Sequence, residues 1–279
     1  MANNPPYDPA AYRNFEHVAW TAVPGSYQTH FGILTSQAVD PLLDAVGTVQ
    51  GTRLLEVACG PGHLSAAAAT RGAACVGVDF VAEMVAEAQR RHPGIEFREG
   101  DAEALSFPDE SFDAVVCGFG MLHFGRFEDA IAEAHRVLVP GGRYAYTVWV
   151  PPERESVNLR RIVRSAIAKH GQAHGLLPPA PAEFGDLDEM KRVLLTAGFV
   201  DVEATTLPIV GRWSEPEQVL ETLYGGMGRT RALVEAQTVA ARENIERAIL
   251  ESARQFERDG VIEIPMPAML AHGRRASSI

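Results

Sequence analysis

Residues 54–65 decide the fold, and they read Leu-Leu-Glu-Val-Ala-Cys-Gly-Pro-Gly-His-Leu-Ser. An apolar run ends there in a turn with two glycines, and an alanine-rich segment at 66–69 follows directly. Because Gly60 and Gly62 lack a Cβ, the backbone can turn sharply and a ligand can approach it closely. The free N–H groups of a helix that begins after the turn favour an anionic ligand group. The stretch therefore predicts a strand, a ligand-binding turn and a helix.

A second apolar run at 74–78 ends on Asp79. A carboxylate about 20 residues beyond such glycines, at the end of the second strand, accepts the two hydroxyls of a ribose. The pattern is not the dinucleotide fingerprint G-x-G-x-x-G, because Ala58 and Ser65 stand at two of its positions. An ordinary strand–turn–helix corner is the alternative for the glycines alone, and Asp79 together with the motifs below argues against it.

Two more motifs follow in order. Residues 99–108 place Asp101 after a third strand at 95–98, and residues 111–120 give a fourth strand that runs into a loop. With these, the chain resembles the class I S-adenosylmethionine-dependent methyltransferases, in particular the small-molecule group that includes ubiquinone-biosynthesis enzymes. The resemblance is strong over 51–150. It implies an α/β, three-layer Rossmann-like fold with a mostly parallel seven-stranded sheet, an antiparallel last strand, N-terminal helices and a helical cap inserted before that strand.

The resemblance also implies a cofactor, S-adenosylmethionine, and roles for single residues. It places Glu56 near the methionine amino group, Asp79 at the ribose, and Asp101 at the adenine amino group with Ala102 beside the ring. Ala58 replaces the family's usual first glycine, and we expect its methyl group to be accommodated at little cost. The further cofactor contacts expected on this basis are Cys59, Gly60, Gly62, Phe80, Met84, Gly118 and Phe119.

Composition limits the partners. At 279 residues with 46% hydrophobic content, the chain can bury a full core. The net charge of −11 argues against nucleic acid and anionic membranes, because both require a basic surface. No apolar run is long enough to span a membrane, the N-terminus does not resemble a signal peptide, and the three cysteines read as free thiols. We expect a cytoplasmic enzyme with a small-molecule substrate, and a homo-oligomer is left open.

We expect one methyltransferase domain over 1–279, with a polar leader at 1–15 and an N-terminal helical cover at 15–48. The cofactor-binding core is 51–150, with a further helix at 151–169 and a strand at 199–210. A helical segment at 214–258 precedes a last strand at 261–270. Because strands six and seven of this fold are usually joined by a short turn, we expect 214–258 to cap the substrate site. The alternative is a peripheral or dimer-forming insertion.

The expected substrate contacts are Trp20, Tyr27, Met121, Trp149 and Tyr224, with packing in the core as the alternative for each. His123 is the first candidate for a general base, because its loop faces the transferred methyl group. We expect His63, at a helix start, to stay neutral, and His17 and His30 are alternative bases. Residues 118–124 hold no carboxylate, so no metal site is expected.

Two other functions are weighed. A member of the same fold could bind S-adenosylmethionine without transferring a methyl group. A nicotinamide dinucleotide enzyme is weakened by the missing third glycine and by Asp101.

Overall fold

The computed structural model describes residues 6–152, 154, 158–172, 175–181 and 184–277. Within it the chain divides into two compact units. We call 35–149, 183–207 and 268–279 the core unit, and 1–34, 150–182 and 208–267 the helical unit.

The core unit is built on a seven-stranded sheet of order β3-β2-β1-β4-β5-β10-β6. Strands β1 to β5 are parallel to one another, and β10 is antiparallel to both of its neighbours, β5 and β6. This confirms the predicted sheet. The bounds are β1 (Arg53–Val57), β2 (Ala74–Asp79), β3 (Glu96–Glu99), β4 (Phe112–Gly118), β5 (Leu138–Trp149), β6 (Phe199–Leu207) and β10 (Ala268–Arg275).

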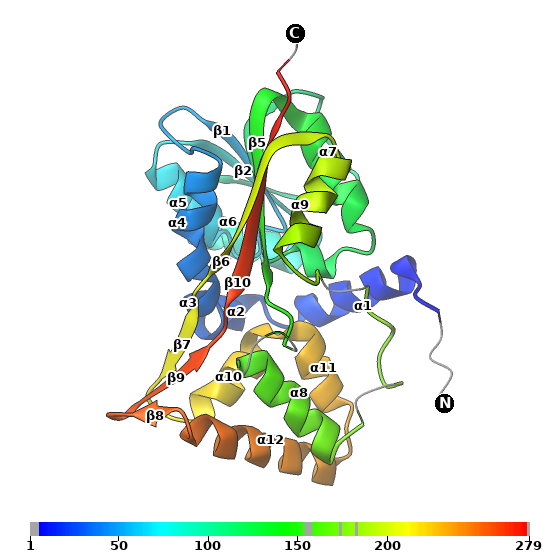
Figure 1. Ribbon diagram of the computed structural model, residues 1–279, viewed down its shortest axis with the longest axis vertical. Helices are drawn as coiled ribbons and strands as arrows, with labels where there is room; N and C mark the ends of the chain where they lie inside the picture. The colour runs from blue at the N-terminus through cyan, green and yellow to red at the C-terminus, as the bar shows by residue number, and fades with distance from the viewer. Residues whose placement is uncertain (1–5, 153, 155–157, 173–174, 182–183, 278–279) are drawn as a thin grey trace. The chain divides into compact units, whose positions relative to one another are not determined.

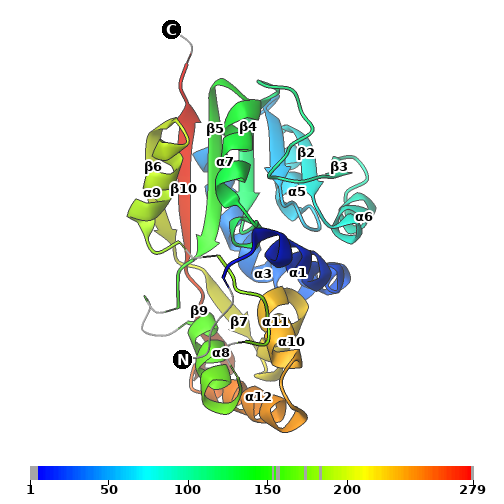
Figure 2. The same cartoon turned by 90° about the vertical axis from the view of Figure 1, so that its right-hand side faces the viewer.

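Helices cover both faces of this sheet (Figure 1). On one face lie α4 (Val39–Ala45), α5 (His63–Thr70) and α6 (Ala82–Arg91), and on the other α7 (Phe127–Val137) and α9 (Leu187–Thr196). Figure 2 shows the strands in order across the sheet, from β6 to β3, with α7 and α9 toward the viewer. A 3-10 turn, η1 (Ser36–Ala38), leads into α4.

The central strands are apolar because both of their faces are covered. Leu54, Leu55, Val115 and Val116 are each 0% exposed. Strands buried on both sides read as continuous apolar runs rather than alternating ones, which is why they are recognisable in the sequence.

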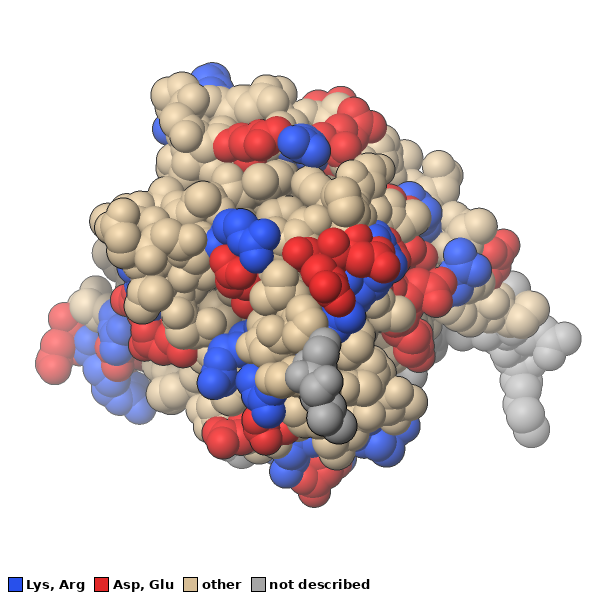
Figure 3. Space-filling model, turned by 90° about the horizontal axis from the view of Figure 1, so that it is seen from above, with Lys and Arg blue, Asp and Glu red and all other residues tan. Residues whose placement is uncertain are grey.

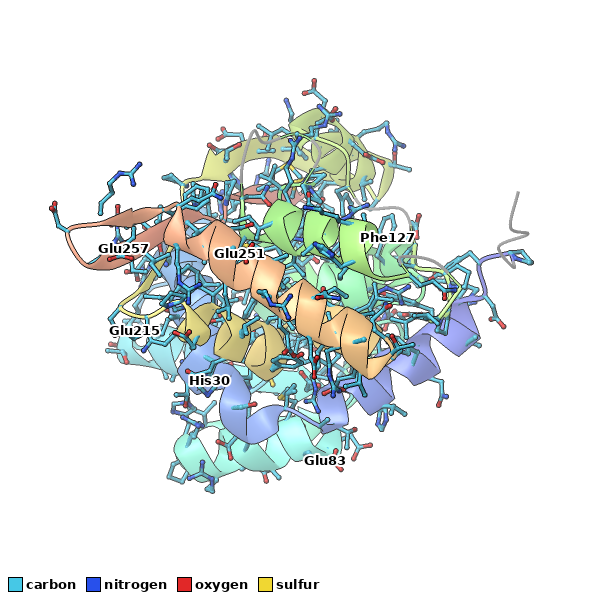
Figure 4. All side chains as sticks on the ribbon, turned by 90° about the horizontal axis from the view of Figure 1, so that it is seen from below. His30, Glu83, Phe127, Glu215, Glu251 and Glu257 are labelled. Carbon is cyan, nitrogen blue, oxygen red and sulfur yellow. The ribbon has the colours of Figure 1, made fainter. Side chains whose placement is uncertain are left out.

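The helical unit holds α1 (Pro9–Thr21), α2 (Pro24–His30), α8 (Leu159–His170), α10 (Glu217–Gly226), α11 (Gly228–Glu235) and α12 (Val239–Arg254). The short α3 (Gly32–Thr35) ends at the boundary between the units. Figure 4 shows α8 beside α12, with His30 at the end of α2. Helices α2 and α10 pack closely, since a Cβ added at Gly225 on α10 would lie 2.7 Å from the His30 Cβ on α2.

Two predicted strands are each divided in two, and the chain enters a second sheet at the division. The segment expected as one strand at 199–210 becomes β6 and β7 (Val210–Trp213), and that expected at 261–270 becomes β9 (Val261–Pro265) and β10. Strands β7, β9 and β8 (Glu257–Arg258) form a separate three-stranded sheet. Pro208 and Pro267 stand at the two breaks, because proline has no N–H to continue a ladder.

Two helix predictions were wrong at their N-terminal ends. The expected leader at 1–15 already contains the start of α1, which begins at Pro9 with the Asp8 side chain accepting from the Ala10 N–H. Residues 1–5 of that leader lie outside the described residues. Of the helix expected over 151–169, residues 153 and 155–157 lie outside the described residues, and α8 begins at Leu159, where the Asn158 side chain caps it.

Candidate active site

The turn after β1 has an unusual backbone. Ala58, Gly60 and Gly62 all have positive φ, at 53°, 50° and 82°. A Cβ added at Gly60 would meet nothing within 4 Å, so the backbone there faces open space. A Cβ added at Gly62 would lie 2.6 Å from the Phe97 ring, so packing excludes a larger residue. We expected alanine at position 58 to be accommodated at little cost. Its left-handed conformation instead costs an L-residue about 1–2 kcal/mol.

Asp79 ends β2 and supports this turn. It is 7% exposed, and its two oxygens accept from the Gly60 N–H at 2.8 Å and the Val81 N–H at 3.0 Å. Burial raises the pKa of Asp79 to about 6, against the lowering effect of these N–H groups and of His123. Each carboxylate oxygen of Asp79 receives one of these backbone hydrogen bonds and can still accept another. Asp79 can therefore also accept hydrogen bonds from ribose hydroxyls.

Glu56, on β1, is 2% exposed. Its Oε2 accepts from the Ser65 N–H at 2.8 Å and from the Ser65 Oγ at 2.5 Å. Burial raises the pKa of Glu56 to about 8, opposed by the two Ser65 hydrogen bonds and reinforced by the charge of Asp79. Glu56 is therefore largely protonated at neutral pH.

Asp101 follows the strand that pairs with β2. Asp79 stands opposite Glu99 in that pair, so the two aspartates lie at the carboxyl ends of neighbouring strands. Asp101 Oδ1 accepts from the Glu103 N–H at 2.9 Å, and Asp101 bridges to Ala104 in a tight turn. Ala102, within this turn, is 6% exposed.

The end of β4 carries a second strained residue, Phe119, with φ of 65°. Its N–H donates to the Thr147 Oγ1 at 3.1 Å, a buried hydrogen bond. Its ring stacks on Trp149, with ring centroids 4.0 Å apart and planes at 20°. Phe119 and Trp149 thus form a buried stacked pair within the core unit.

The loop after β4 includes the 3-10 turn η2 (Met121–His123). Met121 is 1% exposed, and its sulfur accepts from the Tyr144 hydroxyl at 3.4 Å. The predicted substrate residue Met121 thus has a packing partner of its own. His123 lies close enough to Asp79 for its charge to lower the pKa of that carboxyl.

His63 opens α5 directly after Gly62. Its Nε2 lies 3.5 Å from the Thr35 Oγ1. Burial lowers the pKa of His63 to about 4, with a smaller effect from His92. The expected neutral imidazole agrees with this direction, although burial is its main cause.

Two of the other expected cofactor contacts lie in the core. Cys59 and Met84 are 2% and 3% exposed, and Cys59 packs with Val85, Ala88 and Phe97. Gly118 is only partly open, since a Cβ added there would lie 3.3 Å from a Leu64 methyl group.

Three expected substrate residues lie in the helical unit. Trp20 and Tyr27 pack with their ring centroids 5.7 Å apart, and the Trp20 indole donates to the Glu16 Oε2 at 3.1 Å. The Tyr224 hydroxyl donates to Glu246 on α12, and burial together with Glu246 raises the pKa of Tyr224. Glu16 is a carboxylate with 0% exposure that sequence reasoning did not single out.

Sequence reasoning also missed Thr147 and Glu103, which hold the loop after β4. Glu103 belongs to the motif at 99–108, and its position near Asp101 could have suggested a role in the site. No sequence feature indicates a role for Thr147, because it lies within an otherwise apolar strand.

The sequence and the fold are similar to those of known proteins. A family model described as a methyltransferase domain matches residues 55–146. The demethylmenaquinone methyltransferase of Thermus thermophilus is 35% identical over 162 residues, which are 53% of this chain and 74% of that enzyme. The chain belongs to the class I S-adenosylmethionine-dependent methyltransferases. Membership of this family makes S-adenosylmethionine its cofactor, which argues against the nicotinamide dinucleotide hypothesis.

Two further matches are consistent with membership of this family. The demethylmenaquinone methyltransferase of Renibacterium salmoninarum is 45% identical over 102 residues, and the match spans 37% of this chain and 43% of that protein. The crystal structure of the YcgJ protein of Bacillus subtilis covers 87% of this chain and all of its own length, with a TM-score of 0.58 and 19% identity. At this level of sequence identity, the likeness shows that the two proteins share a fold.

The core unit fits this methyltransferase cofactor. Open space in front of Gly60 leaves room for a ligand against the backbone, Asp79 contacts Gly60, and Asp101 follows the end of the neighbouring strand. Among the described residues, no cluster of three His, Cys, Asp or Glu has the arrangement of a metal site. No helix in the described part of the chain has the length and hydropathy to cross a membrane.

Proposed function

We propose that the protein transfers the methyl group of S-adenosylmethionine to a small, mainly apolar acceptor with a quinone-like or phenolic ring. The main observation behind this proposal is the pair Asp79 and Asp101 at the carboxyl ends of β2 and β3. Asp79 contacts the turn at Gly60, where the backbone faces open space. The demethylmenaquinone methyltransferases similar to this chain support the class of acceptor. The stacked Phe119 and Trp149 rings support its apolar character.

In this proposal three acids hold the cofactor. Asp79 accepts from the ribose hydroxyls, Asp101 from the adenine amino group, and Glu56 lies near the methionine ammonium. The backbone at Ala58, Gly60 and Gly118 lies along the cofactor, with Phe80 and Phe119 beside it. The two hydrogen bonds from Gly60 and Val81 support the role of Asp79, because they fix its carboxylate before a ligand arrives.

The chain contributes position, a dry surface and a base. When bound, the cofactor supplies a methyl group on a positively charged sulfur, which makes it an electrophile. Phe119 and Trp149 exclude water and orient an aromatic acceptor. An imidazole nitrogen of His123 takes the proton that the acceptor loses as its oxygen or ring carbon attacks. Alignment of the two reacting atoms can account for about 7–11 kcal/mol of the barrier.

The remaining assignments belong to this proposal as well. Trp20, Tyr27 and Tyr224 contact the acceptor, as does Met121, and the segments 15–48 and 214–258 act as cover and cap.

The protein works in the cytoplasm, without nucleic acid and without a metal requirement. Figure 3 shows acidic and basic side chains interspersed on the face that it draws. A chelator should leave turnover unchanged, and loss of activity would contradict the metal-free proposal.

Methyl transfer is tested with methyl-labelled S-adenosylmethionine and a panel of acceptors that includes naphthoquinols, phenols and small amines. We expect labelled product and S-adenosylhomocysteine with the quinol or phenol members. Transfer only to amines would contradict the acceptor class. Tight cofactor binding without product from any acceptor would favour the alternative of a non-methylating protein of this fold.

A further inference from the structure

The loop that carries His123 must be held in place, because methyl transfer depends on alignment. This loop, residues 119–126, is fixed at its start by the hydrogen bond from the Phe119 N–H to Thr147. Its middle is fixed by the contact of the Tyr144 hydroxyl with Met121. Both partners lie on β5.

The end of the loop is fixed by a residue from another segment. The Glu103 Oε1 accepts from the Gly125 N–H at 2.7 Å and from the Arg126 N–H at 3.1 Å. The Glu103 side chain is 7% exposed. A carboxylate so shielded from water binds N–H groups more strongly than one on the surface.

These N–H groups directly precede α7, whose N-cap residue, Arg126, makes no capping hydrogen bond with its own side chain. Glu103 therefore caps this helix from a distant part of the chain. Its negative charge suits the positive end of the helix dipole. The Arg126 Nε also lies 3.8 Å from the Glu103 Oε2.

Glu103 is joined on its other side to Asp101, since its N–H donates to the Asp101 Oδ1 at 2.9 Å. We infer that Glu103 is a positioning residue, which fixes the His123 loop to the segment that recognises the adenosyl group. The inference rests on the proposed function. Glu103 thus couples the position of the segment that binds adenosine to the position of the loop that carries the base.

The chain offers a matched control. The Glu133 Oε2 accepts from the Leu105 N–H at 2.7 Å, so it too joins a carboxylate to a backbone N–H of the segment after β3. Glu133 lies on α7, and in the described part of the chain its side chain bonds to Leu105 and Arg136 rather than to residues 119–126. Its removal loosens the same region without freeing the His123 loop.

The experiment compares Glu103→Ala, Glu103→Gln and Glu133→Ala with the wild-type protein. For each we measure kcat, the acceptor KM, the cofactor Kd and hydrogen exchange of the 119–126 peptide. In Glu103→Ala, kcat should fall on the order of 10–100-fold, because misplacement by about 1 Å has that effect. Its acceptor KM should change by less than about threefold, and the peptide should exchange faster.

Glu103→Gln should recover part of kcat, because its amide oxygen still accepts from Gly125, and it carries the test if Glu103→Ala does not fold. Glu133→Ala should keep kcat within about twofold of wild type. Unchanged kcat in Glu103→Ala, or an equal loss in Glu133→Ala, would overturn the inference. Absence of turnover in the wild type would instead overturn the proposed function, and exchange of the 119–126 peptide would then decide whether Glu103 fixes the loop.

Discussion

Cofactor binding at neutral pH should release close to one proton, and Glu56 should be its source. Burial raises the pKa of Glu56 to about 8, so about nine-tenths of this group is protonated at pH 7. The proposed neighbour of Glu56 is the positively charged amino group of the cofactor. A cation beside a carboxyl favours its ionised form, so binding should expel the proton.

Isothermal titration calorimetry measures the release as the slope of the binding enthalpy against the ionisation enthalpy of the buffer. We expect a release on the order of one proton at pH 7 and a smaller release above pH 8, where Glu56 is already ionised before the cofactor binds. Glu56→Gln should bind the cofactor without this release. Asp101→Asn serves as the control, since it should weaken binding and keep the release. A wild-type protein that binds without proton release at pH 7 would refute the reasoning.

The same group makes the stability of the cofactor-free protein depend on pH. Between about pH 4.5 and pH 8, Glu56 binds more protons in the folded than in the unfolded state. The unfolding free energy should therefore fall as pH rises through this window, by up to about 5 kcal/mol from Glu56 alone. Urea denaturation should show a flatter pH profile for Glu56→Gln than for wild type, and parallel profiles would contradict the buried acid.

Three further predictions concern single residues. Ala58→Gly should stabilise the protein by about 0.5–1 kcal/mol in urea denaturation, because glycine relieves the strain of a positive φ and loses part of the gain to chain entropy; a clear loss of stability would contradict this. His123→Ala should lower kcat roughly 10²–10⁴-fold and leave the cofactor Kd nearly unchanged, while His92→Ala should keep wild-type kcat; equal kcat values in both variants would remove His123 as the base. Thr147→Val should reduce the unfolding free energy by about 1–3 kcal/mol, because it leaves the buried Phe119 N–H without an acceptor, and wild-type stability would show that this hydrogen bond does not hold the loop.

The sheet and its cofactor turn could be predicted because their signals are local. The continuous apolar runs of β1 and β4, the glycines after β1 and the aspartates after β2 and β3 each occupy a few successive residues. The antiparallel last strand was expected only from the resemblance to the methyltransferase family, because the order of strands along the chain does not by itself give their order in the sheet.

The parts that could not be predicted depend on pairs far apart in sequence. The contact of Glu103 with Gly125 and that of Phe119 with Thr147 join segments 22 and 28 residues apart, and neither pair has a pattern of its own. The strand expected at 199–210 was read as continuous because Val200, Val202 and Ala204 alternate with polar residues, and 261–270 because it is mostly apolar. Pro208 and Pro267 were present as breakers, and only the second sheet shows that they separate two ladders.

The central claim is that Asp79 and Asp101 together hold the adenosyl group, and its most direct test is the S-adenosylmethionine Kd of the Asp79→Asn/Asp101→Asn variant. Hydrogen bonds to charged groups contribute about 1.5–3 kcal/mol each, so losing both charges should weaken binding by roughly 10²–10⁴-fold. The variant should keep a wild-type circular dichroism spectrum, although Asn at position 79 retains only one of the two acceptor oxygens that bind the Gly60 and Val81 N–H groups. A Kd within about threefold of wild type would contradict the account.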